Sequence, residues 1–435
     1  MLRIVRCLCI LLVLVAVSCS NKYTQVIPVR SQMLLSVDLS QADADEGLQK
    51  QLLSLTGGVQ LKAMGIDVSQ KLYAFATDDG LFGFVACVDS KTIVEKWMEH
   101  AGTPLKSHRG YSFSDIGNGF IAAVGSNALL VMGPVSEGSM SSVQQRMVRY
   151  LNSDSDNDIT ATELFSVLEL TAAEGNIALA AKAKALPAMI APLVTLDSIG
   201  SSSNVYVTAT IERNDDVLAI NSNIYSPDED KAAKLAMRQE RFRPLDGSYS
   251  ALMTDSTAVA LFVNTDGTTL LHLLRSSYAT KMLMTGMNTA IDFDNIVRSI
   301  DGETALAVAS MSTSNPSFRM DAKLSNTNFL SDVGYWKKSC PLGSTIFDEG
   351  HGAYVYQWPT GTIHFGADAT NNDFYAYTPN YPTTATNVAT AMEGHRLCMA
   401  VGRKAMLPQE GVAHALLTPF SLLFGDASAM VWRVK

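Results

Sequence analysis

Charged residues are scarce in this sequence of 435 residues. Asp, Glu, Lys and Arg make up 17% of it and hydrophobic residues 47%, whereas an average globular protein is roughly 25% charged. This composition argues against a disordered chain and predicts an ordered, sheet-rich protein with large buried cores. The net charge is 33 − 42 = −9, and no block of Lys or Arg could follow a phosphate backbone. We therefore expect no nucleic-acid partner.

Short motifs of catalysis are also missing. The sequence contains no G-x-S-x-G, S-x-x-K or Walker A motif, and no G-x-G-x-x-G after a strand pattern. The seven histidines include no pair at i, i+4 spacing and no H-E-x-x-H, so the sequence predicts no zinc site. Paired glycosidase carboxylates carry no short motif, and that class stays open. We assign no catalytic residue and expect no metal and no cofactor.

Cysteines are too few for a disulfide framework. Beyond the N-terminal segment, only Cys87, Cys340 and Cys398 remain, an odd number at widely separated positions. Cys87 and Cys398 lie in apolar, strand-like surroundings, so buried unpaired cysteines are the favoured interpretation. A single disulfide between any two of the three is the alternative.

One acidic segment has part of a calcium-loop pattern. Asp154, Asp156 and Asp158 alternate along the chain, but Ile159 and Phe165 occupy the positions where an EF-hand needs glycine and glutamate. A solvated acidic loop is therefore favoured over a calcium site.

The N-terminus has the organisation of a secretory signal. Arg3 and Arg6 precede an unbroken apolar run from Cys7 to Val17, and the small Ser18 precedes Cys19. The run is too short for a bilayer-spanning helix, which needs about 20 apolar residues. A cysteine directly after a small residue resembles the lipobox of bacterial lipoproteins, in which the cysteine thiol is acylated.

The lipobox resemblance predicts how the chain is held. We predict that residues 1–18 are a lipoprotein signal peptide, that Cys19 is lipidated and that residues 19–30 form an anchor and tether. Ala16 stands where leucine is commonest, and an ordinary cleaved signal with a stray cysteine is the alternative. Lipoproteins of the Bacteroides type use an acidic run after the cysteine for export to the surface. Ser20-Asn21-Lys22 is not acidic, which favours the periplasmic face of the outer membrane.

The same order of segments occurs twice along the chain. Four pairs of segments match in the same order along the chain. Val37 aligns with Val263 in one pair, and Tyr111 aligns with Tyr354 in another. Each series contains alternating apolar and polar strands joined by short turns, with few helices. We predict an α+β fold with two related copies of a mainly antiparallel sheet and helices packed on one face. The predicted divisions are a first repeat domain at 31–226, a linker helix at 227–244 and a second repeat domain at 245–435.

Aromatic residues gather in the second series. Tyr354, Tyr356 and Trp358 alternate along one predicted strand, and rings with polar tips on an exposed face would suit stacking on sugars. The first series has Tyr111 and Phe113 at the matching places, which favours core packing instead. Trp358 has no counterpart there and is the first residue to test. The following strands add His364, Phe365, Phe374, Tyr375 and Tyr377.

The segment YTQVIPVRSQMLLSVDL at 23–39 resembles the opening of a family of lipoproteins from Bacteroides-type bacteria, the domain-of-unknown-function 4836 family. The resemblance implies an outer-membrane lipoprotein and no assigned activity. The leading hypothesis is a non-enzymatic binding or scaffold module, held on the membrane through Cys19 and facing the periplasm. Its partner would be an envelope protein or a glycan, and a glycan-binding or glycan-processing accessory lipoprotein is the alternative.

Overall fold

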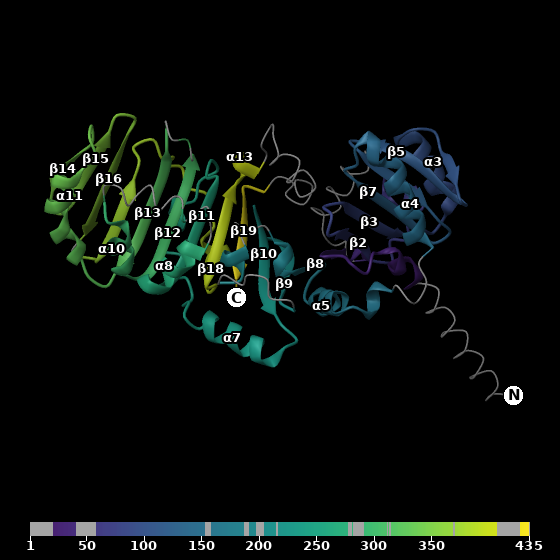
Figure 1. Ribbon diagram of the computed structural model, residues 1–435, viewed down its shortest axis with the longest axis horizontal. Coiled ribbons are helices and arrows are strands. Elements are labelled where there is room, and N and C mark those ends of the chain that lie inside the picture. Colours follow the sequence, from purple (N-terminus) through teal and green to yellow (C-terminus); the bar gives the residue numbers. More distant parts are fainter. Residues whose placement is uncertain are drawn as a thin grey trace. The chain divides into compact units, whose positions relative to one another are not determined.

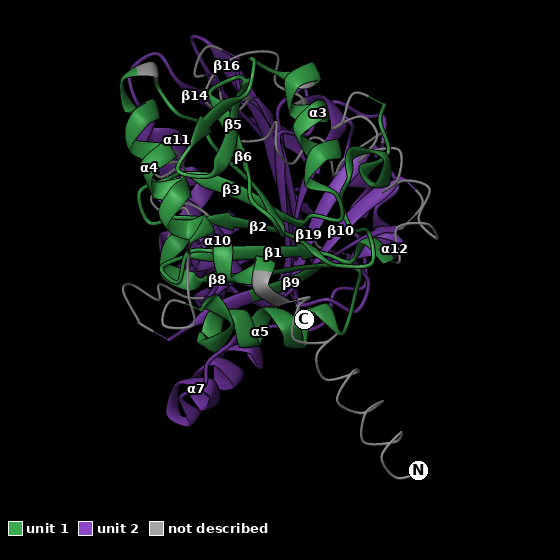
Figure 2. Cartoon of the chain, turned by 90° about the vertical axis from the view of Figure 1, so that its right-hand side faces the viewer, with its two compact units in different colours: residues 1–185, 208–210 green, residues 186–207, 211–435 purple. Residues whose placement is uncertain are grey.

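The computed structural model describes residues 21–40, 58–152, 158–186, 191–196, 204–214, 216–276, 281, 291–310, 312, 315–368, 370–406 and 427–434. The predicted signal peptide and Cys19 lie outside the described residues, as do Asp154 and Asp156. The chain divides into two compact units (Figures 1 and 2). The first contains residues 1–185 and 208–210, and the second contains residues 186–207 and 211–435.

The described strands of the first unit pair in the order β4–β5–β6–β7–β3–β2–β1–β8, and each of these pairs is antiparallel. Short turns join the pairs β2–β3, β4–β5, β5–β6 and β6–β7, and the turn Gly117–Gly119 closes the hairpin of β5 and β6. The strands are β1 (Met33–Val37), β2 (Leu72–Ala76), β3 (Phe82–Cys87), β4 (Lys106–His108), β5 (Tyr111–Gly117), β6 (Phe120–Val124), β7 (Ala128–Gly133) and β8 (Ile177–Lys182).

Helices cover the outer strands of the first unit on both faces. Ser112 Oγ on β5 donates to Glu95 Oε1 of α3 at 2.6 Å, whereas the adjacent Tyr111 hydroxyl donates to Asn152 Oδ1, directly after α4, at 2.6 Å. Because adjacent strand residues point to opposite faces, α3 and α4 lie on opposite sides. The helices are η1 (Asn21–Val26), η3 (Leu61–Met64), α3 (Lys91–Ala101), η4 (Glu137–Ser139), α4 (Met140–Leu151), η6 (Ile159–Ala161), α5 (Glu163–Ala172) and η7 (Ala183–Ala185).

The described strands of the second unit pair in the order β14–β15–β16–β17–β13–β12–β11–β18–β19–β10, followed by β9. Up to β18 this order corresponds strand for strand to that of the first unit. The strands are β9 (Tyr206–Asn214), β10 (Val217–Tyr225), β11 (Val259–Asp266), β12 (Ile300–Ser310), β13 (Ser317–Leu324), β14 (Thr345–Gly350), β15 (Ala353–Trp358), β16 (Gly361–Asp368), β17 (Asp373–Tyr377), β18 (Leu397–Gly402) and β19 (Ala429–Val434).

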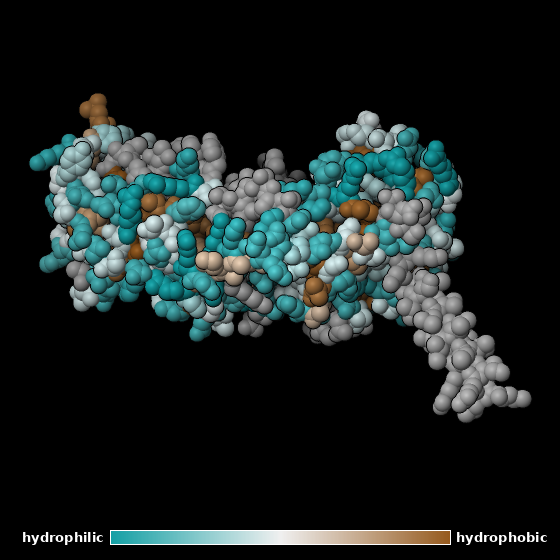
Figure 3. Space-filling model, turned by 60° about the horizontal axis from the view of Figure 1, so that its bottom comes forward, coloured by the Kyte–Doolittle hydropathy of each residue, from teal (hydrophilic) through white to brown (hydrophobic). Residues whose placement is uncertain are grey.

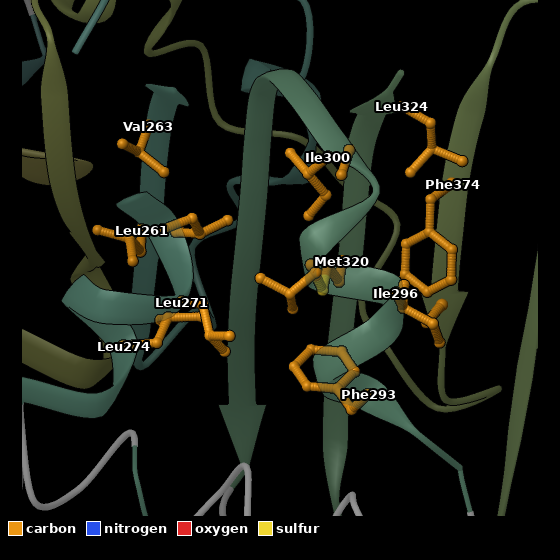
Figure 4. Close-up of a cluster of buried hydrophobic side chains, with 14 of the residues drawn as sticks. Leu261, Val263, Leu271, Leu274, Phe293, Ile296, Ile300, Met320, Leu324 and Phe374 are labelled. Atoms are coloured by element: carbon orange, nitrogen blue, oxygen red, sulfur yellow. The ribbon is translucent and has the colours of Figure 1, made fainter. Parts of the chain in front are cut away.

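Three helices of the second unit, α8, α10 and α11, pack on one side of its strands (Figure 1). Leu271 of α8 and Phe293 of α10 join Met320 and Phe374 of the strands in one buried cluster (Figure 4). Burying a side chain of this size contributes about 1.5–3 kcal/mol. The helices are α6 (Ala191–Val194), α7 (Glu229–Gln239), η8 (Ser250–Leu252), α8 (Gly267–Ser276), α10 (Phe293–Arg298), η9 (Asn328–Asp332), α11 (Val333–Ser339), α12 (Ala389–Met392) and α13 (Arg403–Met406).

A helix forms within the predicted linker segment 227–244. Asp228 caps α7 by accepting from the Lys231 backbone N–H, as its position before the helix favours. Leu235 and Phe242 are buried, whereas the Met237 side chain is 67% exposed. No described helix is long and apolar enough to cross a membrane.

The prediction of two separate sheets is wrong. The described strands form a single sheet of 19 strands, mostly antiparallel, with β10 and β19 as a parallel pair. β9 has residues in both units. Alternation of apolar and polar residues identifies strands locally, but it carries no information on where a sheet ends. An unpaired strand edge is unfavourable, and additional pairing removes that cost.

Candidate functional site

Strand register divides the predicted aromatic residues between two faces of the second unit. Tyr354 on β15 pairs with Phe365 on β16, and their rings stack at a centroid distance of 5.5 Å. Phe365 is buried and its ring also contacts Trp336 of α11. Tyr356 and Trp358 point to the same face as Tyr354, because side chains alternate along a strand. The residues that the sequence singled out therefore lie on the face that α11 covers.

Trp358 packs against its own hairpin. A Cβ built on Gly361 would lie 2.2 Å from Trp358 Cζ2, so the indole lies directly over this glycine. Its Nε1 donates to Thr360 Oγ1 at 3.0 Å, and the Tyr356 ring stacks on it at 5.4 Å. Tyr354 has Lys337 Nζ 5.5 Å from its ring centre, a cation–π distance. All three aromatic side chains are half-buried.

The opposite face carries a second group of aromatic residues. A row of directly paired residues crosses five strands, from Phe347 through Val355, His364 and Tyr377 to Arg319. Phe347 is 50% exposed, and the next three are half-buried. We call this row, together with Tyr375 in the neighbouring row, the open face; Asp321, which pairs with Tyr375, is only 6% exposed. No described helix covers it.

The rings of the open face lie close together at small angles. His364 and Tyr377 stack with centroids 5.1 Å apart and planes 8° apart, and Tyr375 follows at 6.2 Å and 32°. A Cβ on Gly366 would lie 2.7 Å from Tyr375 Oη and 3.0 Å from Cζ. The Tyr375 ring therefore lies across the sheet over Gly366, where any other residue would push it away. A glycine opposite an aromatic residue leaves room for the end of the ring at this place.

Charged groups of both signs surround these rings. His364 Nδ1 lies 3.2 Å from Glu349 Oε2, and Arg319 Nη2 lies 3.0 Å from Asp321 Oδ2. Burial raises the pKa of Asp321, and the neighbouring Arg319 guanidinium opposes this shift. Lys323 Nζ lies 2.8 Å from Asp373 Oδ1. These residues therefore offer hydrogen-bonding groups around the rings, and their positive and negative charges balance one another.

A buried carboxyl group lies on β12 of the same unit. Glu303 is 5% exposed, and its Oε2 accepts from the Asp246 backbone N–H at 2.9 Å, whereas its Oε1 has no partner. Burial, followed by the interaction with the Asp246 side chain, raises the pKa of Glu303 to about 7, and the backbone N–H of Asp246 opposes this shift. Tyr249 donates to Asp373 Oδ1 at 2.9 Å, and burial is the largest cause that raises the Tyr249 pKa. These contacts hold the segment around Tyr249 against the strands.

The remaining candidates form no site in the described part of the chain. Cys87, Cys340 and Cys398 are free, as predicted, but Cys87 and Cys340 are half-buried and only Cys398 is buried. Asp158 caps η6 by accepting from the Thr160 backbone N–H at 2.9 Å. Among the described residues, no three His, Cys, Asp or Glu side chains are placed to hold a metal ion.

The sequence contained a signal for the open face. Tyr375 and Tyr377 alternate with the apolar Phe374 and Ala376 on β17, and His364 precedes Phe365 on β16. A strand that alternates between buried apolar rings and rings with polar tips has two different faces. Assigning alternate residues of each strand to its two faces would have separated this group from Tyr354, Tyr356 and Trp358.

Comparisons with known proteins identify a family but no activity. No curated protein matches the chain. A solved structure, "Structure of crystal form I of TP0453", is 8% identical and is matched over 94% of this chain and 100% of that chain, at a TM-score of 0.24. This score is too low to indicate a common fold. The family model "Domain of unknown function (DUF4836)" matches residues 59–389, beyond the segment 23–39 that carried the resemblance. The chain belongs to the DUF4836 family.

Proposed function

We propose that this protein is a lipid-anchored lipoprotein of the outer membrane, facing the periplasm, that acts as a non-enzymatic binding or scaffold module. The anchor is supported by the charged start, the apolar run and the small residue before Cys19. Each buried methylene of an acyl chain contributes about 0.8 kcal/mol, and stable attachment takes more than one chain. The multiple acylation of bacterial lipoproteins would meet this requirement.

The open face is the observation that carries the binding role. It places half-exposed aromatic rings and charged side chains together on strands, which hold them more rigidly than loops do. Aromatic residues with polar tips are enriched where a surface binds another molecule. The buried neighbours Phe374 and Ala376 on β17 support the strand from its other face.

Fractionation of cells tests the anchor. Cys19→Ser should release the protein from membranes, because serine lacks the thiol that is acylated. Cys340→Ser is the matched control, since Cys340 is a free cysteine within the second unit, and it should stay in the membrane fraction. A Cys19→Ser protein that remains attached to membranes would contradict the anchor.

Crosslinking in intact envelopes tests the binding role. The lipidated full-length protein should recover a specific molecule, and Tyr377→Ala should reduce its recovery. Tyr335→Ala is the matched control, because Tyr335 lies on α11 and is 71% exposed. Equal recovery with the wild-type protein and both variants would show that the open face is not the binding surface.

A glycan-binding or glycan-processing accessory role is the second candidate. The half-buried Tyr375, a ring with a polar tip that lies over Gly366, favours it, because such rings can bind both the apolar face and the hydroxyls of a sugar. Binding and processing differ in whether the bound glycan is cleaved. Product analysis after incubation with an oligosaccharide distinguishes them.

A further inference from the structure

We propose that the first unit lies directly on the membrane, with the surface around η1 and α5 turned toward the lipid headgroups. This inference rests on the proposed lipid anchor and adds which part of the molecule contacts the membrane. We call the residues of this part the anchor surface: Val29, Arg30, Lys71, Glu169 and Leu170. Three observations carry the inference: the short chain between Cys19 and the fold, the position of η1 and α5 on one face, and the side chains exposed there.

The chain packs into the first unit soon after Cys19. Tyr23 is 3% exposed and Ile27 is 1% exposed, and the Tyr23 hydroxyl donates to the Lys71 carbonyl oxygen at 2.9 Å. Three residues, 20–22, separate Cys19 from Tyr23. Because an extended chain spans at most about 3.6 Å per residue, the Cα atoms of Cys19 and Tyr23 can be at most about 14 Å apart. Residues 23–27 are part of the fold and cannot lengthen the tether.

This reach is short compared with the size of the first unit. The acyl chains of a lipidated cysteine lie in the hydrocarbon core, so the cysteine itself lies in the headgroup layer, which is about 5–8 Å thick. A unit with the number of residues of the first one has a radius of gyration of about 16 Å. A tether shorter than this radius prevents the unit from turning freely. The side of the unit around η1 therefore remains against the headgroups.

Both η1 and α5 pack on the same residue of the sheet. The ring centre of Tyr73 on β2 lies 6.0 Å from that of Tyr23 in η1 and 5.8 Å from that of a phenylalanine of α5. The Tyr73 hydroxyl donates to Glu169 Oε1 of α5 at 3.1 Å, and Lys71 Nζ lies 2.6 Å from Glu169 Oε2. Figure 1 shows α5 beside the purple segment with which the described chain begins. The exposed Leu170 follows Glu169, so it belongs to the surface around η1.

The anchor surface combines apolar and charged side chains. Leu170 is 68% exposed and Val29 is 36% exposed, and the neighbouring Arg30 is also exposed. The Lys71 and Glu169 side chains are 27% and 37% exposed. A zwitterionic headgroup carries a phosphate and an ammonium group, so it can pair with charges of both signs. The net charge of −9 for the whole sequence disfavours a strongly anionic membrane.

The exposed apolar groups are too scattered for deep insertion. In Figure 3, which turns the bottom of Figure 1 forward, hydrophobic residues reach the surface in small separate places. Proteins that insert without an anchor use a continuous apolar face. We therefore expect the anchor surface to contact the headgroups and the lipid on Cys19 to hold it there.

The opposite face of the first unit supplies a control position. Tyr73 pairs with Val85, and the row of directly paired residues continues through β7 and β6 to Phe113 on β5, two residues from Tyr111 on the face of α4. Directly paired residues share a face, so η1 and α5 lie on the face of α4 and opposite to α3. Ile93 of α3 is 42% exposed and should remain away from the lipid.

Photocrosslinking in intact cells tests the inference. The photoreactive p-benzoylphenylalanine replaces Leu170, Arg30 or Ile93 in the full-length lipidated protein, and the purified protein is analysed by mass spectrometry for phospholipid on the peptide that contains it. Crosslinking to phospholipid at positions 170 and 30 should exceed that at position 93 severalfold. Equal crosslinking at the three positions of a membrane-bound protein would overturn the inference.

A longer tether separates this inference from the anchor itself. A flexible Gly-Ser segment of about 15 residues between Ser20 and Asn21 adds about 20 Å of mean end-to-end distance. The protein should stay in the membrane fraction, while crosslinking at position 170 falls to the level of position 93. Unchanged crosslinking would contradict the role of the short tether. If the Cys19→Ser protein stays in the membrane fraction, the anchor fails instead. Thermal unfolding of each variant confirms that it is folded.

Discussion

The outer strands of the two units are covered differently. In the first unit, α3 and α4 lie on opposite faces of β5–β7, and most residues of β6 and β7 are buried. In the second unit, α11 covers one face of β15–β17, and most residues of β15 are only partly buried. The same strand order therefore supports two different surfaces.

The difference originates in the connection that follows the outer strands. In the first unit, residues 134–176 join β7 to β8 and include α4 and α5. In the second, residues 378–396 join β17 to β18, and the helix among them is the four-residue α12. This shorter connection packs Tyr381 and Met392 against the central strands β11 and β12. A sheet face that no helix covers is in contact with solvent, and the open face carries rings with polar tips.

The largest expected effect comes from removing a ring on a covered face. Phe113→Ala in the first unit removes a side chain that is 2% exposed and should lower the free energy of unfolding by about 3–5 kcal/mol. Tyr377→Ala on the open face should lower it by about 1 kcal/mol. Urea unfolding of both variants measures this, with Phe374→Ala on the covered side of β17 as a control that should resemble Phe113→Ala. If Phe113→Ala and Tyr377→Ala lower the free energy of unfolding equally, Tyr377 is as well covered as Phe113, and the description of the open face is wrong.

A smaller effect is expected from filling the space under Tyr375. Gly366→Ala would place a Cβ 2.6 Å from the Gly352 carbonyl oxygen and 2.7 Å from Tyr375 Oη, so we expect a loss of about 1–3 kcal/mol. Gly334→Ala on α11 is the matched control. A Cβ there meets nothing within 4 Å, and alanine should stabilise the helix by about 0.5–1 kcal/mol. Thermal unfolding measures both, and an unchanged stability of Gly366→Ala would contradict the position of Tyr375 over Gly366.

The pH dependence of stability should differ between the units. The pKa of Glu303 is raised from 4.5 to about 7, so the folded second unit binds this proton more tightly than the unfolded chain. Stability from this group is complete below about pH 4.5 and falls as the pH rises to about 7, by about 1–3 kcal/mol. Glu303→Gln should remove this fall because glutamine does not titrate. Urea midpoints between pH 4.5 and 8 measure the effect, and an unchanged slope in the variant would refute it.

Local features of the fold could be predicted from the sequence. The hairpins β5–β6 and β15–β16 occur where short Gly-containing turns separate alternating strands. The extent of the sheet could not be predicted, because it depends on the pairing of β10 with β19, a strand far from it along the chain. Strand register is a further example. The sequence aligned Tyr111 with Tyr354, yet Tyr111 bonds to Asn152 after α4, whereas Tyr354 lies under Lys337 of α11.

The candidate site was predictable in composition but not in position. His364, Tyr375 and Tyr377 belong to the aromatic group that the sequence contains, but Trp358 was the preferred residue. Trp358 is distinctive in the sequence because it has no counterpart in the first series, and the structure places it over Gly361 on its own hairpin. Which face remains open depends on the absence of a described helix between β17 and α12. That property belongs to the tertiary packing, so residue types alone do not reveal it.

The smallest expected effect concerns the ion pair that ties α4 to the first unit. Arg146 of α4 pairs with Asp79 in the turn between β2 and β3, and its hydrogen bond lowers the pKa of Asp79 to about 2. Stability from this carboxylate is present above about pH 4 and is lost as the pH falls toward 2, the direction opposite to that of Glu303. Because the Asp79 side chain is 48% exposed, Asp79→Asn should cost less than about 1 kcal/mol at neutral pH. Asp255→Asn, which breaks the pair with Lys404 in the second unit, is the matched control, because the Asp255 side chain is also 48% exposed. Urea unfolding at pH 7 and pH 3 measures both, and a loss well above 1 kcal/mol for Asp79→Asn would show that α4 depends on this ion pair more than on its buried Val143 and Met147.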